Sequence, residues 1–161
     1  MSQTHDIHDL AAIKREAVDE KRKLHGFLTT STKYELTDAY DLSVAYTPGV
    51  AEPCLLIKDN EEESFNLTCR GNMVAVISDG TRVLGLGNIG AAAAMPVMEG
   101  KALLFKKFGN VDCVPLVIDT EDPEEFIHTV KLLQKNYAGI NLEDISSPKC
   151  YEIENRLKEE L

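Results

Sequence analysis

Two cations stand where this sequence could form a site for an anion. Arg82 lies inside a glycine-rich stretch, and Lys101 follows on an apolar segment with helical character. A tight turn that carries a cation and leads into a helix favours anion binding, because the first turn of a helix presents unpaired N–H groups. An exposed surface lysine is the alternative for Lys101 and the usual state of this residue type. Its apolar neighbours favour partial burial, and the missing side chain of Gly100 would leave room for a ligand.

Two adjacent carboxylates, Glu143 and Asp144, follow a short apolar run near the end of the sequence. Both could reach one hard divalent cation, which prefers oxygen ligands. A carboxylate at the end of a strand can instead cap the next helix, and Asp79 and Asp119 stand in similar places. From the residues alone, metal binding and helix capping both remain open for the doublet.

Tyr46 directly precedes the turn signal Thr47-Pro48-Gly49. Proline fixes φ and glycine tolerates the left-handed region, so a turn is expected here. One interpretation makes Tyr46 a partly buried aromatic residue at the base of a loop. The other makes it a rigidly held phenol at the mouth of a pocket, able to donate a proton.

The glycines at residues 85–90 spell GLGNIG and match the dinucleotide fingerprint G-x-G-x-x-G. That fingerprint requires a strand to end at the first glycine and an acidic residue about 20 positions later. Here the apolar strand ends near Ser78, although Val83 and Leu84 could form a second short strand. The next strand ends at Asp119, about 30 residues on. Dinucleotide binding in the usual Rossmann manner is therefore not expected.

Alternating apolar segments of strand and helix length predict the fold class. An α/β protein is expected, with a layered helix/sheet/helix arrangement, a mostly parallel sheet and a preceding N-terminal helix. The predicted strands are residues 73–78, 111–119 and 140–142, and the predicted helices include 7–24, 89–108 and one that begins after Thr120 and stops at Gly139. Ligands of open parallel sheets bind beyond the carboxyl ends of the strands, where the acidic residues stand.

Composition limits the classes of function. The chain has 161 residues, a formal net charge of −10 and 43% hydrophobic residues, as expected for one globular domain without affinity for nucleic acid. No apolar run is long enough to span a membrane, and the charged N-terminus does not resemble a signal peptide, so a cytoplasmic location is expected. The four cysteines, Cys54, Cys69, Cys113 and Cys150, form no CxxC pair, so free thiols are expected rather than a zinc site.

Three long motifs in the correct order give a specific resemblance. YTPGVAEPC, SDGTRVLGLGNIGAAAAMPVMEGKALLFKKFG and GINLEDIS together resemble the N-terminal domain of malic enzyme in its short bacterial-type form. The resemblance implies an N-terminal helical segment, residues 1–24, and a substrate and metal domain, residues 25–161. It also implies oxidative decarboxylation of L-malate to pyruvate and CO2, with NAD or NADP and with Mg2+ or Mn2+, by a homodimer.

The resemblance assigns roles to the candidate residues. Tyr46 would be the general acid that protonates the enol of pyruvate, and Lys101 the general base that also contacts malate. Arg82 would bind the malate carboxylate and lie near the nicotinamide of the cofactor. Glu143 and Asp144 would be metal ligands. The family's third metal-binding aspartate and its nucleotide-binding domain lie beyond the GINLEDIS region, and the sequence stops before both, so the isolated chain is expected to be inactive.

A second interpretation belongs to another functional class. A non-catalytic module for dimerisation or for binding a small organic acid would also fit an N-terminal helix followed by an α/β layer. The features that favour an enzyme are the tyrosine, the lysine and the acidic doublet inside their motifs.

Overall fold

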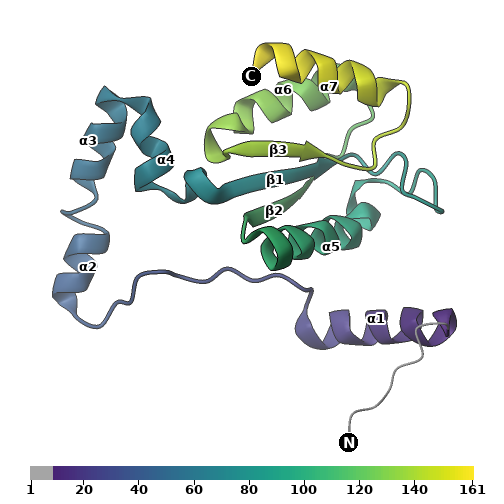
Figure 1. The fold of residues 1–161 in the computed structure, drawn as a ribbon, viewed down its shortest axis with the longest axis horizontal. Coiled ribbons are helices and arrows are strands. Elements are labelled where there is room, and N and C mark those ends of the chain that lie inside the picture. Colours follow the sequence, from purple (N-terminus) through teal and green to yellow (C-terminus); the bar gives the residue numbers. More distant parts are fainter. Residues whose placement is uncertain (1–8) are drawn as a thin grey trace, which may run out of the picture.

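A computed structural model describes residues 9–161 of the chain. A three-stranded parallel sheet with strand order β2-β1-β3 stands at its centre (Figure 1). The strands are β1 (Met73–Ser78), β2 (Asp112–Val117) and β3 (Gly139–Leu142). Val74 of β1 is paired with Cys113 of β2 on one side and with Gly139 of β3 on the other. The predicted α/β class with a parallel sheet is confirmed.

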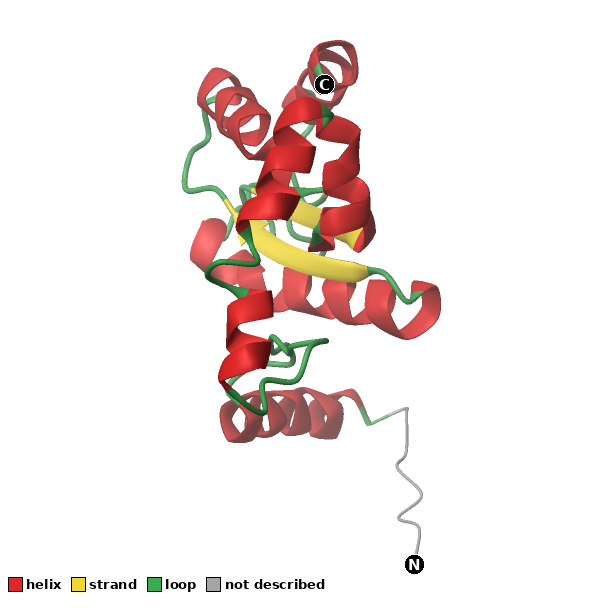
Figure 2. Cartoon of the chain, turned by 90° about the vertical axis from the view of Figure 1, so that its left-hand side faces the viewer, coloured by secondary structure: helices red, strands yellow, loops and turns green. Residues whose placement is uncertain are grey.

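Helices cover both faces of the sheet (Figures 1 and 2). On one face lies α5 (Ala91–Gly109), and on the other lie α6 (Pro123–Leu133) and α7 (Lys149–Glu160). The core between the sheet and α6 and α7 consists of apolar side chains from β1, α6, α7 and the loop after β3: Ala75, Ile77, Phe126, Ile127, Val130, Ile145, Ile153 and Leu157. Because successive side chains of a strand point to opposite faces, a strand covered on both sides is expected to be apolar along its length, and β1 is apolar from Met73 to Ile77.

Local signals explain where the helices of this layer begin. Asp122 caps α6 by accepting hydrogen bonds from the backbone N–H groups of Glu124 and Glu125 at 2.7 and 3.3 Å, and Pro123 occupies the first helical position. α5 is continuous from Ala91 to Gly109, with Pro96 inside the helix. The N-terminus of α5 follows Gly90 directly, which places the helix at the end of the glycine-rich loop.

The first part of the chain forms an arm beside the layered core. It consists of α1 (Leu10–Leu24), α2 (Ala39–Ala45) and α3 (Ala51–Asp59), followed by η1 (Glu61–Glu63), α4 (Ser64–Leu67) and η2 (Cys69–Asn72). The short helix η3 (Gln134–Asn136) precedes β3. The first predicted helix is confirmed from Leu10 onward, and its predicted start at Ile7 lies outside the described residues. Coil and the start of α2 occupy the stretch from His25 to Asp41.

A single charged side chain joins α1 to the core. The ammonium of Lys21 lies 2.5 Å from Glu99 of α5 and 4.1 Å from the ring centre of Phe27. No side chain of α1 is buried, and Leu10 and Ile13 on its apolar face are exposed. The ion pair between Lys21 and Glu99 therefore connects α1 to α5, while apolar side chains such as Leu10 and Ile13 stay uncovered by the described residues. The division of the chain at residue 24 stays a prediction.

Candidate active site

The glycine-rich loop between β1 and α5 is a compact turn whose backbone explains its glycines. Gly80 has a φ of 70°, and a Cβ atom added there would lie 2.3 Å from the carbonyl oxygen of Gly90. Val83 forms an isolated bridge with Gly87, so the second short strand that the sequence suggested is reduced to one bridge. Arg82 sits on this loop with its side chain exposed, and it forms no ion pair with any described residue.

The acidic doublet lies on the loop after β3, directly beside the glycine-rich loop. The N–H of Glu143 donates to the carbonyl of Ile77 at 2.9 Å, which extends the contact between β3 and β1. The N–H of Arg82 donates to the carbonyl of Asp144 at 3.0 Å. The backbone therefore joins the predicted substrate-binding arginine to one of the two predicted metal ligands. Neither carboxylate caps a helix, because α7 begins only at Lys149.

The Asp144 carboxyl group lies in surroundings that disfavour its charge. Its Oδ2 atom is buried and accepts no hydrogen bond from any described residue. Burial raises the pKa of Asp144, the negative charge of Glu143 raises it further, and the nearby Lys101 ammonium opposes both effects. An orphaned carboxylate oxygen of this kind fits a position that a cation would occupy.

Lys101 reaches this doublet from the other side of the sheet layer. Its ammonium lies 2.6 Å from Glu143 Oε1, and its side chain is 37% exposed. The expectation of a partly buried lysine is confirmed, while the surface alternative is not. The amide of Asn141 donates to the same carboxylate oxygen at 3.3 Å. Gly100 has open space where a Cβ would stand, so the surface beside Lys101 is accessible.

Tyr46 does not join the other candidates within this chain. It directly follows α2, which stands apart from the sheet, whereas the glycine-rich loop follows the carboxyl end of β1 (Figure 1). Its side chain is 67% exposed. The interpretation as a partly buried residue at the base of a loop is therefore wrong. The other interpretation, a phenol at the mouth of a pocket that donates a proton, stays a prediction. The sequence alone does not reveal that Tyr46 lies apart from the other candidates, because the direction of the segment that carries α2 depends on the tertiary structure.

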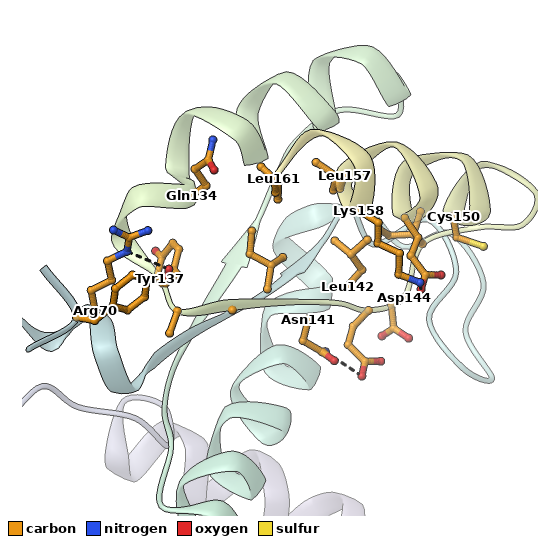
Figure 3. A pocket seen from close by; sticks show the side chains of 17 residues that line it. Arg70, Gln134, Tyr137, Asn141, Leu142, Asp144, Cys150, Leu157, Lys158 and Leu161 are labelled. Carbon is orange, nitrogen blue, oxygen red and sulfur yellow. Dashed lines mark hydrogen bonds and ion pairs between the residues drawn. The ribbon is translucent and has the colours of Figure 1, made fainter. Parts of the chain in front are cut away.

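A cavity of about 730 Å³ runs along the outer edge of β3. Figure 3 shows Arg70 and Tyr137 at one end of it and Asp144, Cys150 and Lys158 at the other. Among the described residues that line it, Glu143 and Asp144 belong to the predicted site. The carboxylate pair thus opens toward this cavity, while Lys101 approaches Glu143 from α5.

Two carboxylates and one lysine meet at this point of the structure. Within residues 9–161, no group of three or more His, Cys, Asp or Glu side chains could hold a metal ion. The residues present fit part of a ligand set, because Asp144 offers an unpaired buried oxygen and Glu143 offers a carboxylate that already pairs with the Lys101 ammonium.

All four cysteines are free thiols, and no helix among the described residues is long and apolar enough to cross a membrane.

Sequence reasoning missed the side chains that hold the two loops together. Asp79 was noted only as one of several acidic residues at strand ends, yet it is buried and paired with Lys149 at 2.7 Å. Thr81 was part of a motif without a role, yet its hydroxyl oxygen accepts from the N–H of Ser146. No local pattern could have identified Lys149, since its partner is distant in sequence.

Comparison with known proteins places this geometry in a family. The family model "Malic enzyme, N-terminal domain" matches residues 25–123 and 120–158 of the chain. A bifunctional malic/malolactic enzyme from Bacillus subtilis is 50% identical over 149 residues, which are 92% of this chain and 36% of that protein. An NAD-dependent malic enzyme from Geobacillus stearothermophilus is 55% identical over 84% of this chain and 28% of its own length. A probable NADP-dependent malic enzyme from Rickettsia prowazekii is 57% identical over 86% of this chain and 18% of its own length.

Solved structures agree with the sequence comparison. The malic enzyme from Pyrococcus horikoshii superimposes with a TM-score of 0.87 at 47% identity, covering 92% of this chain and 35% of that one. Entamoeba histolytica malic enzyme gives a TM-score of 0.90 at 36% identity and covers 100% of this chain and 35% of its own. The chain spans between 18% and 36% of the length of the three curated relatives named above. The family model covers nearly all of the described core, and the same layered fold recurs in these solved malic enzymes, so the chain belongs to the malic enzyme N-terminal domain family.

Proposed function

We propose that this chain is the substrate- and metal-binding part of a malic enzyme, which converts L-malate to pyruvate and CO2 with NAD or NADP. The observation that supports this proposal is the meeting of Arg82, Lys101, Glu143 and Asp144 at the carboxyl ends of β1 and β3. A cation for a carboxylate, a candidate base and two oxygen ligands are the groups that this reaction requires. The relatives carry names of NAD-dependent and NADP-dependent malic enzymes, which supports a nicotinamide cofactor.

Arg82 would bind a carboxylate of malate. Its guanidinium is exposed and forms no ion pair with a described residue, so it is available for a charged, two-point contact with an acid. The backbone bond from its N–H to Asp144 fixes the start of its side chain relative to the metal ligands. Substrate and metal would then be held at a fixed separation.

Lys101, in its neutral amine form, would act as the base that accepts the proton of the malate hydroxyl group. The hydride from C2 of malate leaves to the nicotinamide, and the carboxylate on C3 then leaves as CO2, which gives the enolate of pyruvate. Return of the proton from Lys101 to the C2 oxygen gives the enol. Glu143 holds the Lys101 ammonium at 2.6 Å and so orients the side chain toward the carboxylate pair. Tyr46 would return a proton to C3 of the enol.

Glu143 and Asp144 would hold Mg2+ or Mn2+ as part of a larger ligand set. The unpaired, buried Oδ2 of Asp144 supports this role. When bound, such an ion polarises the C2 oxygen and stabilises negative charge that develops there. Glu143 would exchange its contact with Lys101 for one with the cation, which leaves the lysine free to meet substrate.

A homodimer would bring Tyr46 to this site. Within one chain Tyr46 directly follows α2, which lies apart from the sheet and the glycine-rich loop (Figure 1), so we infer that it serves the site of a second copy. Apolar side chains uncovered on the arm and on the outer face of α5 support such an interface: Tyr40, Leu42, Val44, Val50, Leu55, Leu56, Val97, Leu103, Leu104 and Phe108. Gly100, which has open space at its Cβ position, would let a partner approach Lys101 closely.

Substitution of Lys101 tests the reaction in a full-length protein that contains this chain. We expect Lys101→Ala to abolish malate-dependent reduction of NAD or NADP in the presence of Mg2+ or Mn2+. Lys107→Ala, on the exposed side of the same helix, is the matched control and should retain activity. A wild-type protein that binds malate without any turnover would instead support the non-catalytic acid-binding module. Retained turnover in Lys101→Ala would contradict the assignment of the base.

Mixing two inactive variants tests whether Tyr46 acts across the dimer. If Tyr46 serves the partner's Lys101, a heterodimer of Tyr46→Phe with Lys101→Ala contains one intact site and one doubly altered site. Random exchange of subunits should then restore about a quarter of wild-type activity. A site built within one chain would give no recovery, because each copy would lack one of the two groups.

The cytoplasmic location stays a prediction that cell fractionation can test.

A further inference from the structure

Three contacts join two loops that carry the proposed site. We name residues 79–82, after β1, the arginine loop, and residues 143–149, after β3, the carboxylate loop. The N–H of Arg82 donates to the carbonyl of Asp144 at 3.0 Å, and the N–H of Ser146 donates to Thr81 Oγ1 at 2.9 Å. The third contact is the ion pair of Asp79 with Lys149 at 2.7 Å. The loops are therefore joined by a ladder of contacts rather than by a single bond.

Asp79 is the most deeply buried charged group in this ladder. Its side chain is 1% exposed, and both of its carboxylate oxygens have partners. Oδ1 accepts from the N–H and the hydroxyl of Thr81 at 2.9 and 2.7 Å, and Oδ2 faces Lys149. A buried carboxylate is tolerated only when it is paired and hydrogen-bonded in this way. Since neither oxygen is available to substrate, the role of Asp79 is to hold other residues.

Thr81 connects Asp79 to the carboxylate loop through one hydroxyl group. The hydroxyl donates its proton to Asp79 and accepts from the N–H of Ser146, so its orientation is fixed at both ends. Lys149 closes the other end of the ladder. It is the first residue of α7, its side chain is 16% exposed, and it also donates to the carbonyl of Glu121 at 3.1 Å. The ladder is thus anchored on a helix of the core.

We propose that Asp79, Thr81 and Lys149 are positioning residues that fix the separation between Arg82 and the metal ligands Glu143 and Asp144. The inference rests on the proposed function and deepens it. Arg82 follows Thr81 directly in sequence, and Asp144 lies two residues before Ser146, so a shift of the Thr81–Ser146 contact moves both functional residues. Residues that hydrogen-bond to metal ligands, without contacting the metal, commonly contribute about 10- to 100-fold to metal affinity. We expect an effect of this order here.

Thr81→Val and Thr81→Ser form the decisive pair of variants in the full-length protein. Valine keeps the shape of threonine but removes the hydroxyl, whereas serine keeps the hydroxyl. We expect Thr81→Val to weaken Mn2+ binding, measured by titration calorimetry without substrate, about tenfold. The KM for malate should rise more than kcat falls, because ground-state contacts of Arg82 are disturbed. Thr81→Ser should stay within about twofold of wild type on both measures.

The buried ion pair is tested by charge removal on both sides. Asp79→Asn alone leaves the Lys149 ammonium without its carboxylate and can prevent folding. The double variant Asp79→Asn, Lys149→Met leaves no unpaired charge, and it should fold with weakened Mn2+ binding. Ile153→Val, in the core contact of α7, is the control for a purely structural effect. It should lower the melting temperature but leave the Mn2+ affinity and the KM unchanged.

Amide hydrogen exchange separates failure of this inference from failure of the proposed function. The N–H groups of Arg82 and Ser146 should exchange faster in Thr81→Val than in wild type or in Ile153→Val, whether or not the protein oxidises malate. An active wild type together with unchanged exchange, Mn2+ affinity and KM in Thr81→Val would overturn the positioning role. An inactive wild type, together with faster exchange in Thr81→Val, would overturn the proposed function and leave the ladder established.

Discussion

Replacing Asp144 by asparagine should change stability and metal binding in opposite directions. The buried Oδ2 atom of Asp144 has no hydrogen-bond partner among the described residues, and an unpaired buried acceptor costs about 1–3 kcal/mol. Asparagine removes the charge and the repulsion from Glu143. We expect Asp144→Asn to be more stable than wild type by about 1 kcal/mol at neutral pH without metal, because burying a neutral amide costs less than burying a charged carboxylate. The gain is small because the residue is only partly buried. The left-handed backbone, with φ 54°, also suits asparagine.

The direction of the pKa shift fixes how this difference depends on pH. Burial, followed by the charge of Glu143, raises the pKa of Asp144 above its ordinary value of 3.8. A carboxyl group with a raised pKa binds its proton more tightly in the folded chain, so the free energy of unfolding falls as pH rises through the window between 3.8 and the raised value. Below this window both states are protonated, and the variant and wild type should have similar stability. Above it the full difference should appear.

Urea unfolding followed by circular dichroism measures the difference, at pH values from about 3.5 to about 7.5. Asp119→Asn is the matched control, because Asp119 also follows a strand but is exposed, and its substitution should have no such effect. Adding Mn2+ at ten times its dissociation constant should stabilise wild type by about 1.4 kcal/mol and leave Asp144→Asn unchanged. A variant that is less stable than wild type at neutral pH, or that gains equally from Mn2+, would refute the reasoning.

Three further predictions concern the parts of the fold that hold the site. Ile153→Ala should reduce the free energy of unfolding by about 2–5 kcal/mol in urea titrations, because this fully buried side chain fills the core under α7. Gly80→Ala should lower the melting temperature and weaken Mn2+ binding in calorimetry, since its Cβ would collide with the carbonyl of Gly90. Lys21→Ala should leave the core intact but speed proteolytic cleavage within residues 25–38, since α1 would lose its ion pair with Glu99; equal cleavage of both proteins would contradict this role.

The contact between Lys101 and Glu143 changes how the proposed site is understood. A candidate base and a candidate metal ligand neutralise each other at 2.6 Å, so the cluster is charge-balanced before any ligand arrives. The same pairing orients Lys101 toward the position where a bound acid would meet the carboxylates. Because the local charges balance, the net charge of −10 would not by itself keep an anionic substrate from the proposed site.

Local patterns in the sequence determined the main elements of the core. β1 was predicted as Met73–Ser78 from its unbroken apolar run, and the structure has the same bounds. The other two strands and α5 were found with ends shifted by one or two residues, because helix and strand ends depend on capping contacts. The start of α6 follows from Asp122 and Pro123, whose effect is confined to the first turn. These signals act over a few residues, so sequence alone reveals them.

Only the tertiary structure decided which of the chemical groups meet. The sequence marked Arg82, Lys101, Glu143 and Asp144 individually, and folding brought them to one end of the sheet because parallel strands share a carboxyl edge. Folding also places Tyr46 away from these four residues, since the segment that carries α2 lies beside the core and not within it (Figure 1). The buried pair of Asp79 and Lys149 had no local signal, because its two halves lie on different loops and a lysine becomes a structural residue only through its neighbours.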